Sequence, residues 1–345
     1  MGKKVLVSGY YGFSNPGDDA ILEEILKLIK SKDREPVVLY NTNRYFFKEG
    51  VHYVPRNSFK SIIYWMRLSS LLISGGGGLF QDATSFKSFL YYFLIILLAK
   101  IFGKSIIIYG QSFGPINRAV SLKLLTIALF STSAIFLRDT YSLRLTYSLG
   151  RYENVFLMPD VVYLRDMVPE RTKRKDLKFL LFPRKKGDIE ILIKNLDDIL
   201  NDFNISLKII PMHYAEDISV AKKIYEYLKS REKSVILLDK QCQIGCIMRE
   251  ISGGFAVLSY RFHALLFAHI LDRSFLGISD DPKIISFLSD IKAPYINLNT
   301  RNLRYLKEWI FEVISTRKID ISLWKGKKIK RRILQRINQD FYKFL

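Results

Sequence analysis

An alternation of short apolar runs with helical patterns constrains the fold of this chain more than any other feature. In the first half, strands are predicted at "VLVSG", "PVVLY", "SLLISGGG", "SIIIYGQ" and "AIFLRD", and helical spacing of apolar residues lies between most of them. Strands that alternate with helices form parallel sheets, because each crossover helix returns the chain to the same end of the sheet. The first half therefore predicts a doubly wound parallel sheet.

The alternation restarts after the charged segment "RDMVPERTKRKD", whose composition is that of a linker. Strands are predicted at "LKFLLFPR", "LKIIPMH", "SVILLD", "FAVLSY" and "SFLGIS", and helices near 188–202, 217–230, 241–252, 262–271 and 282–290. We therefore expect an α/β protein with two Rossmann-like domains facing across a cleft, as in the glycosyltransferase B type. The expected parts are residues 1–170, residues 171–315 and a basic C-terminal helical segment, residues 316–345.

Charge limits the classes of partner. The chain of 345 residues has a net charge of +21, which suits nucleic acid, an anionic membrane surface or a small anionic substrate. Nucleic acid is not expected, because the sequence has no zinc-finger, helix-turn-helix or RNA-binding aromatic signature. The most apolar run, "FLYYFLIILLA" at residues 89–99, is too short to span a bilayer and predicts a buried helix.

Cysteine usage and the N-terminus bear on the compartment. Cys242 and Cys246 are the two cysteines, and their spacing of four puts them on one face of a helix. Neither a second cysteine pair nor a nearby histidine completes a metal site, so we expect no metal and two reduced core thiols. The chain enters a strand almost at once, without a signal-peptide pattern. Both features favour a cytoplasmic protein, with peripheral contact at the inner face of the cell membrane left open.

Glycine-rich turns follow three predicted strands of the first half. In "SGYYGFSNPGDDAILEEIL", Gly9, Gly12 and Gly17 have intervals that differ from GxGxxG, so a nucleotide fingerprint is not supported. Asp18 opens the next helix, either as its N-cap or as a functional carboxylate. The turns "ISGGGGLFQD" and "YGQSFGPI" repeat this arrangement. Because ligands bind at the carboxyl ends of strands in open α/β sheets, these turns predict a binding site.

Basic residues lie at further strand ends. Arg138 in "FLRDTYS" is either an anion ligand or the partner of the neighbouring Asp139. In "SYRFHALLFAHI", Arg261 and His263 come where a strand gives way to a helix, and His263 is either a proton donor or a capping or core histidine. Lys283 in "GISDDPKII" occupies the same position after the next strand.

The ordered motifs together resemble the polysaccharide pyruvyltransferase family, in particular its bacterial cell-surface polysaccharide type. The motifs are "GYYGFSNPGDDAIL", "SGGGGLFQD", "YGQSFGPI", "LRDTYS", "PDVVY", "SYRFHALLFA" and "SDDPKI", spread over residues 5–290. The resemblance implies a glycosyltransferase B-like fold, phosphoenolpyruvate as donor and no further cofactor. It also implies pyruvate placed as a cyclic ketal on a sugar of a glycan or of its lipid-linked precursor. The chain departs from the family at Asp19, where glutamate is commoner, and at Phe262, where leucine is commoner.

Ketal formation from phosphoenolpyruvate needs a proton donor and a cationic cradle, which leads to a set of expected site residues. The expected catalytic residues are His263, Arg261 and Asp18. The expected donor-binding residues are Arg138, Lys283, Gly75, Gly76 and Gly77. The expected substrate-binding residues are Gly12, Asn15, Gln81, Asp82 and Gln111, with Asp82 the alternative base to Asp18.

Two other function classes stay open from the sequence. One is a glycosyltransferase that uses a nucleotide sugar, since the expected architecture is the same. The other is a non-catalytic basic protein that binds nucleic acid or a membrane surface. The C-terminal segment combines basic residues with an apolar stripe, Ile329, Ile333, Leu334, Ile337 and Phe341. This segment is expected either to lie on an anionic membrane or to pack back on a domain.

Overall fold

The computed structural model describes residues 4–41, 48–165, 177–185, 189–297, 303–316 and 321–345. They form two compact units, the first made of Met1–Phe13, Asp18–Arg165 and Ile329–Leu345, and the second of Ser14–Gly17 and Asp166–Lys328. The expected boundary near residue 170 and its linker lie outside the described residues. Of the expected C-terminal segment at residues 316–345, Ile329–Leu345 belongs to the first unit.

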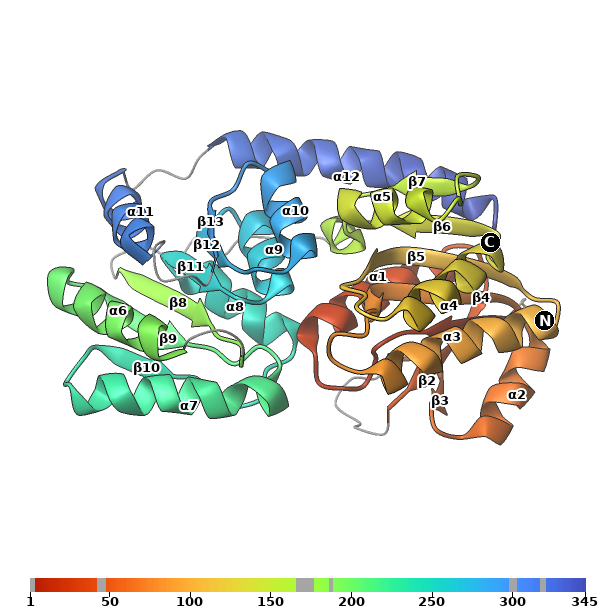
Figure 1. The fold of residues 1–345 in the computed structure, drawn as a ribbon, viewed down its shortest axis with the longest axis horizontal. Helices are drawn as coiled ribbons and strands as arrows, with labels where there is room; N and C mark the ends of the chain where they lie inside the picture. Colours follow the sequence, from red (N-terminus) through yellow and green to blue (C-terminus); the bar gives the residue numbers. More distant parts are fainter. Residues whose placement is uncertain (1–3, 42–47, 166–176, 186–188, 298–302, 317–320) are drawn as a thin grey trace. The chain divides into compact units, whose positions relative to one another are not determined.

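The first unit is built on a parallel sheet of seven strands in the order β3-β2-β1-β4-β5-β6-β7 (Figure 1). Its strands are β1 (Lys4–Ser8), β2 (Glu35–Tyr40), β3 (His52–Pro55), β4 (Ser69–Phe80), β5 (Ser105–Phe113), β6 (Ala134–Leu137) and β7 (Val155–Leu157). The strand order reverses between β1 and β4, which makes their carboxyl ends a topological switch point where ligands bind in such sheets. The short edge strand β3 was not predicted, because its four residues carry no apolar run.

Helices cover both faces of this sheet. They are α1 (Pro16–Lys30), α2 (Phe59–Leu68), α3 (Phe86–Ile101), α4 (Ala119–Phe130), α5 (Thr140–Ser148) and the short 3₁₀ helix η1 (Val161–Leu164). Helices α2, α3 and α4 share one core with Ile106 and Ile108 of β5. Neighbouring strand residues point to opposite faces, and Tyr109 packs on Phe341 of the last helix, with ring centroids 4.3 Å apart. The last helix therefore covers the face opposite to α2–α4.

The second unit has a parallel sheet of six strands in the order β10-β9-β8-β11-β12-β13. Its strands are β8 (Lys178–Phe182), β9 (Ser206–Ile209), β10 (Val235–Leu237), β11 (Ala256–Ser259), β12 (Ser274–Ile278) and β13 (Tyr295–Ile296). Its helices are α6 (Ile189–Asp202), α7 (Tyr214–Ser230), α8 (Ile244–Gly253), α9 (Phe262–Ile270), α10 (Pro282–Asp290) and α11 (Leu303–Thr316), followed by α12 (Ile321–Tyr342), which continues into the first unit. The five predicted helices of this half are present, within a few residues of the expected bounds.

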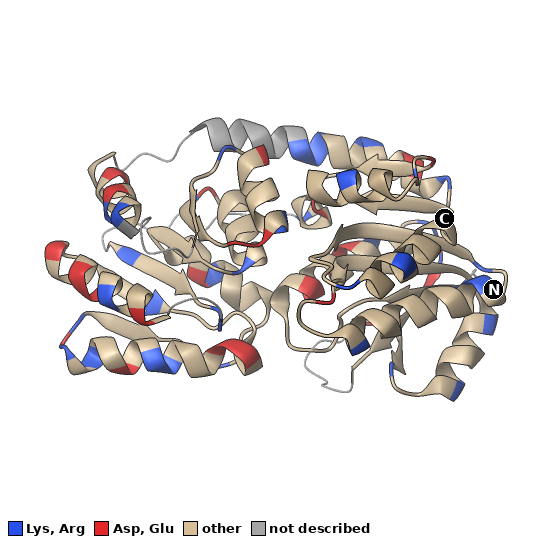
Figure 2. Cartoon of the chain, viewed as in Figure 1, with Lys and Arg blue, Asp and Glu red and all other residues tan. Residues whose placement is uncertain are grey.

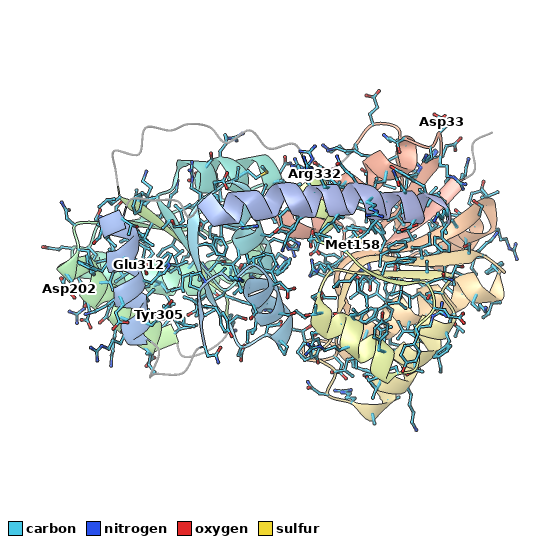
Figure 3. All side chains as sticks on the ribbon, turned by 90° about the horizontal axis from the view of Figure 1, so that it is seen from above. Asp33, Met158, Asp202, Tyr305, Glu312 and Arg332 are labelled. Carbon is cyan, nitrogen blue, oxygen red and sulfur yellow. A yellow bond between two sulfur atoms is a disulfide. The ribbon has the colours of Figure 1, made fainter. Side chains whose placement is uncertain are left out.

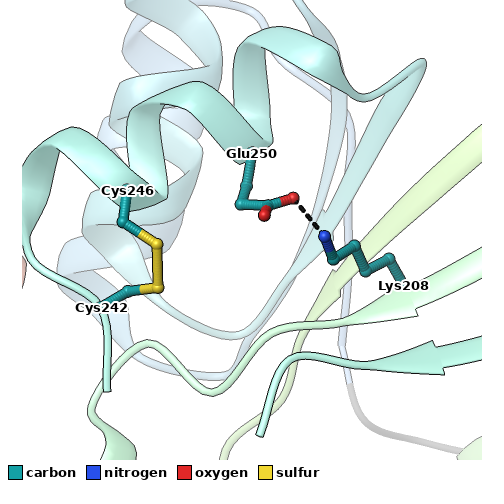
Figure 4. Close-up of a disulfide and its surroundings, with 4 residues drawn as sticks. All are labelled: Lys208, Cys242, Cys246 and Glu250. Atoms are coloured by element: carbon teal, nitrogen blue, oxygen red, sulfur yellow. Dashed lines mark hydrogen bonds and ion pairs between the residues drawn. A yellow bond between two sulfur atoms is a disulfide. The ribbon is translucent and has the colours of Figure 1, made fainter. Parts of the chain in front are cut away.

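The two cysteines are not reduced thiols, which corrects the sequence-based expectation. Cys242 and Cys246 form a disulfide at the start of α8, with Cα atoms 5.4 Å apart (Figure 4). The spacing of four on one helix face was recognised, but the same spacing also brings two sulfurs within bonding distance. The expectation of a cytoplasmic protein rested in part on reduced cysteines, and the disulfide removes that support.

The apolar run at residues 89–99 forms most of α3, yet the helix is buried on one side only. Phe89, Phe93 and Ile96 lie in the core, whereas Leu94 is exposed. A helix that is apolar all round gives no periodic signal for its solvent side, so the sequence predicted burial throughout. Along the described stretches of the chain, no helix combines the length and apolar character needed to cross a bilayer.

Candidate active site

Three glycines near the carboxyl end of β4, Gly75–Gly77, let α1 approach the end of the first sheet. The sequence predicted a glycine-rich turn after the strand, but these glycines lie inside β4. Gly76 and Gly77 have positive φ angles of 44° and 82°, which residues with a side chain rarely adopt. A Cβ atom on Gly77 would lie 2.6 Å from Oδ1 of Asp18, and one on Gly75 would lie 2.8 Å from the Tyr11 hydroxyl. Because Gly77 has no side chain, the Asp18 carboxylate can lie close to the backbone of β4. Donor binding by Gly75, Gly76 and Gly77 stays a prediction.

Two adjacent carboxyl groups lie in the first turn of α1, and because the helix begins at Pro16, the prediction of Asp18 as its N-cap is wrong. Asp18 is buried and Asp19 is almost completely buried. Burial, followed by the charges of Asp18 and Glu23, raises the pKa of Asp19 to about 8, against the effect of a hydrogen bond from the Gly12 backbone. Asp19 therefore holds a proton at neutral pH. Sequence reasoning named Asp18 as a site residue and treated Asp19 only as a departure from the family, although two successive carboxylates at a helix start were the available signal.

Asp82 and Gln81 have local roles in the turn after β4. Asp82 accepts hydrogen bonds from the backbone N–H groups of Asn117 at 2.7 Å and Arg118 at 3.0 Å, at the start of α4. Burial raises the pKa of Asp82, but these hydrogen bonds outweigh it, so the pKa is lowered. Gln81 accepts a hydrogen bond from the Thr84 backbone at 3.1 Å. Asp82 therefore acts as a helix cap and is a poorer base than the sequence suggested.

Gln111 joins two strands inside the sheet. Its amide Nε2 donates to the carbonyl of Ser74 at 2.9 Å and to the Ser74 hydroxyl at 2.7 Å, and the residue has no exposed surface. These bonds give Gln111 a structural role, and its contact with substrate stays a prediction. Gly12, with a φ of 81°, packs against the Asn41 backbone.

Arg138, at the end of β6, is one half of a buried ion pair. Its Nη1 lies 2.7 Å from Oδ2 of Asp160, and its Nε donates to the Ser112 hydroxyl at 2.7 Å. The neighbouring Asp139 instead caps α5 by accepting from the Ser142 backbone at 2.7 Å. The salt-bridge alternative was thus right in kind but wrong in partner, because Asp160 comes from the "PDVVY" motif further along the chain.

Arg261 lies at the carboxyl edge of the second sheet, directly after β11. It is the N-cap residue of α9, and its guanidinium donates to both carboxylates at the start of α7: to Asp217 through Nε at 3.0 Å and to Glu216 through Nη2 at 2.9 Å. Burial alone lowers the pKa of Arg261, but the two carboxylates outweigh it and raise the pKa. Arg261 is therefore held in place by acids, which the sequence analysis did not foresee.

Two more residues missed by sequence reasoning belong to this edge. Nδ1 of His213, after β9, lies 3.0 Å from Oε1 of Glu216, and this hydrogen bond is the largest cause that lowers the pKa of Glu216 to about 2. Arg184 follows β8, and burial together with the charge of Arg261 lowers its pKa. The runs "FPRKKG" and "PMHYAED" were the available signals, since each comes directly after a predicted strand.

His263 and Lys283 complete the second edge. His263 is buried near the start of α9, and its ring packs edge-on against Phe262 at 5.1 Å between centroids. The segment Ser14–Gly17 belongs to this unit, and a side chain on Gly17 would overlap the His263 ring. Asn15 accepts from the Gly17 backbone at 3.1 Å, which shapes that segment. Lys283 lies at the start of α10, with its Nζ 3.9 Å from Oδ2 of Asp281.

The expected site residues therefore fall into two groups. The first edge, at the carboxyl ends of β1, β4, β5 and β6, holds Asp18, Gly75–Gly77 and Arg138. The second edge, at the carboxyl ends of β8, β9, β11 and β12, holds Arg261, His263 and Lys283 together with Arg184. Within the residues that the structure describes, His, Cys, Asp and Glu side chains form no group of three or more able to hold a metal ion.

Comparison with protein families identifies one match. A family model described as polysaccharide pyruvyl transferase matches residues 15–282. That span includes most of the residues of both edges. No curated protein sequence matches the chain.

Solved structures share the fold at low sequence identity. The UDP-GlcNAc 2-epimerase of Methanocaldococcus jannaschii has a TM-score of 0.62 and 12% identity, covering 98% of this chain and 100% of that one. Anabaena Alr3699/HepE in complex with UDP and glucose has a TM-score of 0.68 and 11% identity, over 99% and 98%. Acinetobacter baumannii MurG has a TM-score of 0.52 and 12% identity, over 96% and 99%. The expected glycosyltransferase B-like fold with two Rossmann-like domains is confirmed.

Proposed function

Since this chain belongs to the polysaccharide pyruvyl transferase family, we propose that it moves pyruvate from phosphoenolpyruvate onto a sugar as a cyclic ketal. The acceptor would be a sugar of a cell-surface polysaccharide or of its lipid-linked precursor. The observation that carries the proposal is the family match over residues 15–282, which includes most of the residues of both strand-end edges. The basic groups at the second edge fit the negative charges of such a donor.

The proposed reaction balances without a redox partner. A proton added to the methylene carbon of phosphoenolpyruvate makes the central carbon electrophilic, and one sugar hydroxyl adds to it. The second hydroxyl then displaces phosphate from the same carbon. Of the two hydroxyl protons, one replaces the proton delivered to the new methyl group and the other leaves with phosphate. The protein must therefore supply a proton donor, a proton acceptor and cations that face the donor.

The second edge is assigned the donor. His263 would deliver the proton, since imidazole exchanges protons near neutral pH. Lys283 and Arg184 would face the phosphate and carboxylate groups of phosphoenolpyruvate. Arg261, held by Asp217 and Glu216, would act mainly as a positioning residue that fixes the start of α9 next to His263.

The first edge is assigned the acceptor sugar. Asp18 would accept a proton from a sugar hydroxyl, because Asp82 is committed to the start of α4. Asp19 stays protonated at neutral pH, so it adds no second negative charge beside Asp18. A carboxylate beside a neutral acid suits an uncharged diol better than it suits a phosphate, which like charges would repel.

A donor-choice assay tests the proposal. The purified full-length protein is incubated with nitrophenyl or lipid-linked sugars and either phosphoenolpyruvate or UDP-sugars, and phosphate release and product mass are measured. Phosphate release with a product heavier by one pyruvate ketal is the expected result. Glycosyl transfer from a UDP-sugar would instead favour the second candidate, a glycosyltransferase, which the similarity to the UDP complex of Anabaena HepE supports.

A further inference from the structure

Three helices on one face of the first sheet expose an unusual amount of apolar surface. On α2 the exposed apolar side chains are Phe59, Tyr64 and Leu68, and on α3 they are Leu94 and Ile101, with Ile101 71% exposed. Monomeric proteins seldom expose large contiguous apolar patches without a binding function. This face is therefore a candidate interaction surface, and it is called the α2–α4 face below.

The exposed residues follow helical stripes. On α4, Val120, Lys123, Ile127 and Phe130 are exposed at intervals of three and four, so they share one side of the helix. On α3, Lys87, Leu94 and Ile101 recur every seven residues on the solvent side. Because the opposite sides of both helices pack into the sheet, these stripes face solvent together.

A cavity joins α2 to α3 within this face. It has a volume of about 390 Å³ and is lined by residues that include Phe59, Leu94, Leu97 and Ile101. Arg56 lies at its wall, with its guanidinium 4.0 Å from the centroid of the Tyr91 ring. Apart from Arg56 and Asn57, the lining residues are aliphatic or aromatic, so the cavity is suited to a hydrocarbon chain with an anionic group near Arg56.

Charges on the α2–α4 face have a single sign. The helices carry the exposed cations Lys60, Arg67, Lys87, Lys100 and Lys123, and none of their sequences contains Asp or Glu (Figure 2). By contrast, α6 and α7 of the second unit carry both signs, for example Asp198 and Lys194 on α6. Apolar stripes among cations are the pattern of a surface that binds anionic lipid.

We propose that the α2–α4 face docks on an anionic lipid bilayer, with its exposed apolar side chains at the level of the headgroups and its lysines and arginine on lipid phosphates. A second copy of the chain is a poorer occupant, because pairing the face with itself would oppose like charges. Nucleic acid is also a poorer occupant, since most residues of the two stripes are apolar and make no contact with phosphate. The proposal goes beyond pyruvyl transfer and does not depend on it.

The C-terminal helix, for which the sequence left membrane contact and packing on a domain as alternatives, packs part of its apolar stripe on the first unit. Leu334 and Phe341 are fully buried in the first unit, and the Tyr109 hydroxyl bonds to Asn338 of the same side at 2.5 Å. Arg332 lies on the exposed side (Figure 3). The basic side chains of residues 325–328 lie outside the described residues.

Vesicle sedimentation of the full-length protein tests the proposal. Vesicles of phosphatidylcholine alone are compared with vesicles that also contain phosphatidylglycerol, at low and high salt. We expect binding to the anionic vesicles that weakens with salt. Ile101→Glu should reduce the partition coefficient at least about tenfold, because it places a charge in the apolar stripe. Leu94→Glu serves as the second variant if Ile101→Glu does not fold.

Matched controls separate this face from other exposed residues. Phe311→Glu changes a similarly exposed aromatic residue on α11 of the second unit and should bind like wild type. The triple variant Lys60→Gln/Lys100→Gln/Lys123→Gln should lose binding, whereas Arg332→Gln/Arg336→Gln on α12 should keep it. All variants are compared by thermal midpoint, and their activity on a water-soluble acceptor should be unchanged.

Three outcomes would overturn the docking surface. The first is wild-type protein that stays in the supernatant with anionic vesicles at low salt. The second is binding that survives Ile101→Glu and Leu94→Glu but is lost in the α12 double variant. The third is concentration-dependent dimerisation without vesicle binding, abolished by Ile101→Glu, which would assign the face to a second copy. None of these outcomes requires catalysis, so a failed activity assay leaves this test intact.

Discussion

The carboxyl edges of the two sheets are built alike but charged differently. At the first edge, glycines at the end of β4 bring Asp18 and the protonated Asp19 against the strand, and the Arg138 charge is matched by Asp160. At the second edge, Arg184, Arg261, Lys283 and His263 gather at three strand ends, with Asp217 and Glu216 holding one of the cations. Corresponding edges of two sheets of one fold type thus carry different charged groups, mainly acids at the first edge and mainly bases at the second.

Replacement of His263 tests the assignment of proton transfer to the second edge. We expect His263→Ala to lower kcat/KM by about 10²–10⁴-fold, the range for loss of a general acid. His52→Ala, which removes an exposed histidine of β3 outside both edges, is the matched control. Turnover within a few-fold of wild type in the folded His263 variant would remove the second edge from proton transfer.

Arg138 and Asp160 test whether the cation of the first edge is structural. Breaking a buried ion pair costs about 3–5 kcal/mol, so Arg138→Ala should lower the thermal midpoint by several degrees. The double variant Arg138→Met/Asp160→Leu should recover part of that loss, because it leaves no unpaired buried charge. A stable Arg138→Ala protein with weakened phosphoenolpyruvate binding would instead return Arg138 to the donor site.

The affinity of a Lys283 variant for phosphoenolpyruvate tests whether the second edge binds the donor. A charge-assisted contact contributes about 1.5–3 kcal/mol, so Lys283→Ala should raise the Kd for phosphoenolpyruvate by about one to two decades. Calorimetry measures this Kd, and Lys229→Ala, at the end of α7, is the control. An unchanged Kd would place the donor elsewhere than the second edge.

The pH dependence of stability tests the neutral acid of the first edge. The pKa of Asp19 rises from 3.8 to about 8 on folding, so between these values the folded state holds a proton that the unfolded chain releases. The free energy of unfolding therefore decreases with rising pH in this window, by about 1 kcal/mol per pH unit. Asp19→Asn has no proton to lose there.

Thermal melts of wild type and Asp19→Asn at about pH 6 and pH 8 measure the difference. The variant should gain stability relative to wild type as the pH rises. Parallel pH profiles for the two proteins would mean that Asp19 is ionised in the folded state. The first edge would then contain no neutral acid.

Local sequence patterns determined the architecture and the strand ends at which polar groups gather. Helix α1, which begins at Pro16, was evident from Ile21, Leu22, Ile25 and Leu26, all of which are buried. The same alternation predicted that Arg138, Arg261, His263 and Lys283 follow strands. Residues that follow parallel strands lie at one edge of the sheet, because all the carboxyl ends are at that edge. These features depend only on residues close together in the chain.

Only the tertiary structure decided what each of these groups contacts. Arg138 meets Asp160 and Arg261 meets Asp217 across long stretches of chain, and no local pattern specifies which carboxylate arrives there. The proton on Asp19 depends on burial beneath neighbouring elements, which its own sequence neighbourhood does not set. On α3, where nearly every position is apolar, packing against the sheet selected the buried side and left Leu94 and Ile101 in solvent. Partner choice, protonation and exposure are long-range properties, because each arises from groups that only folding brings together.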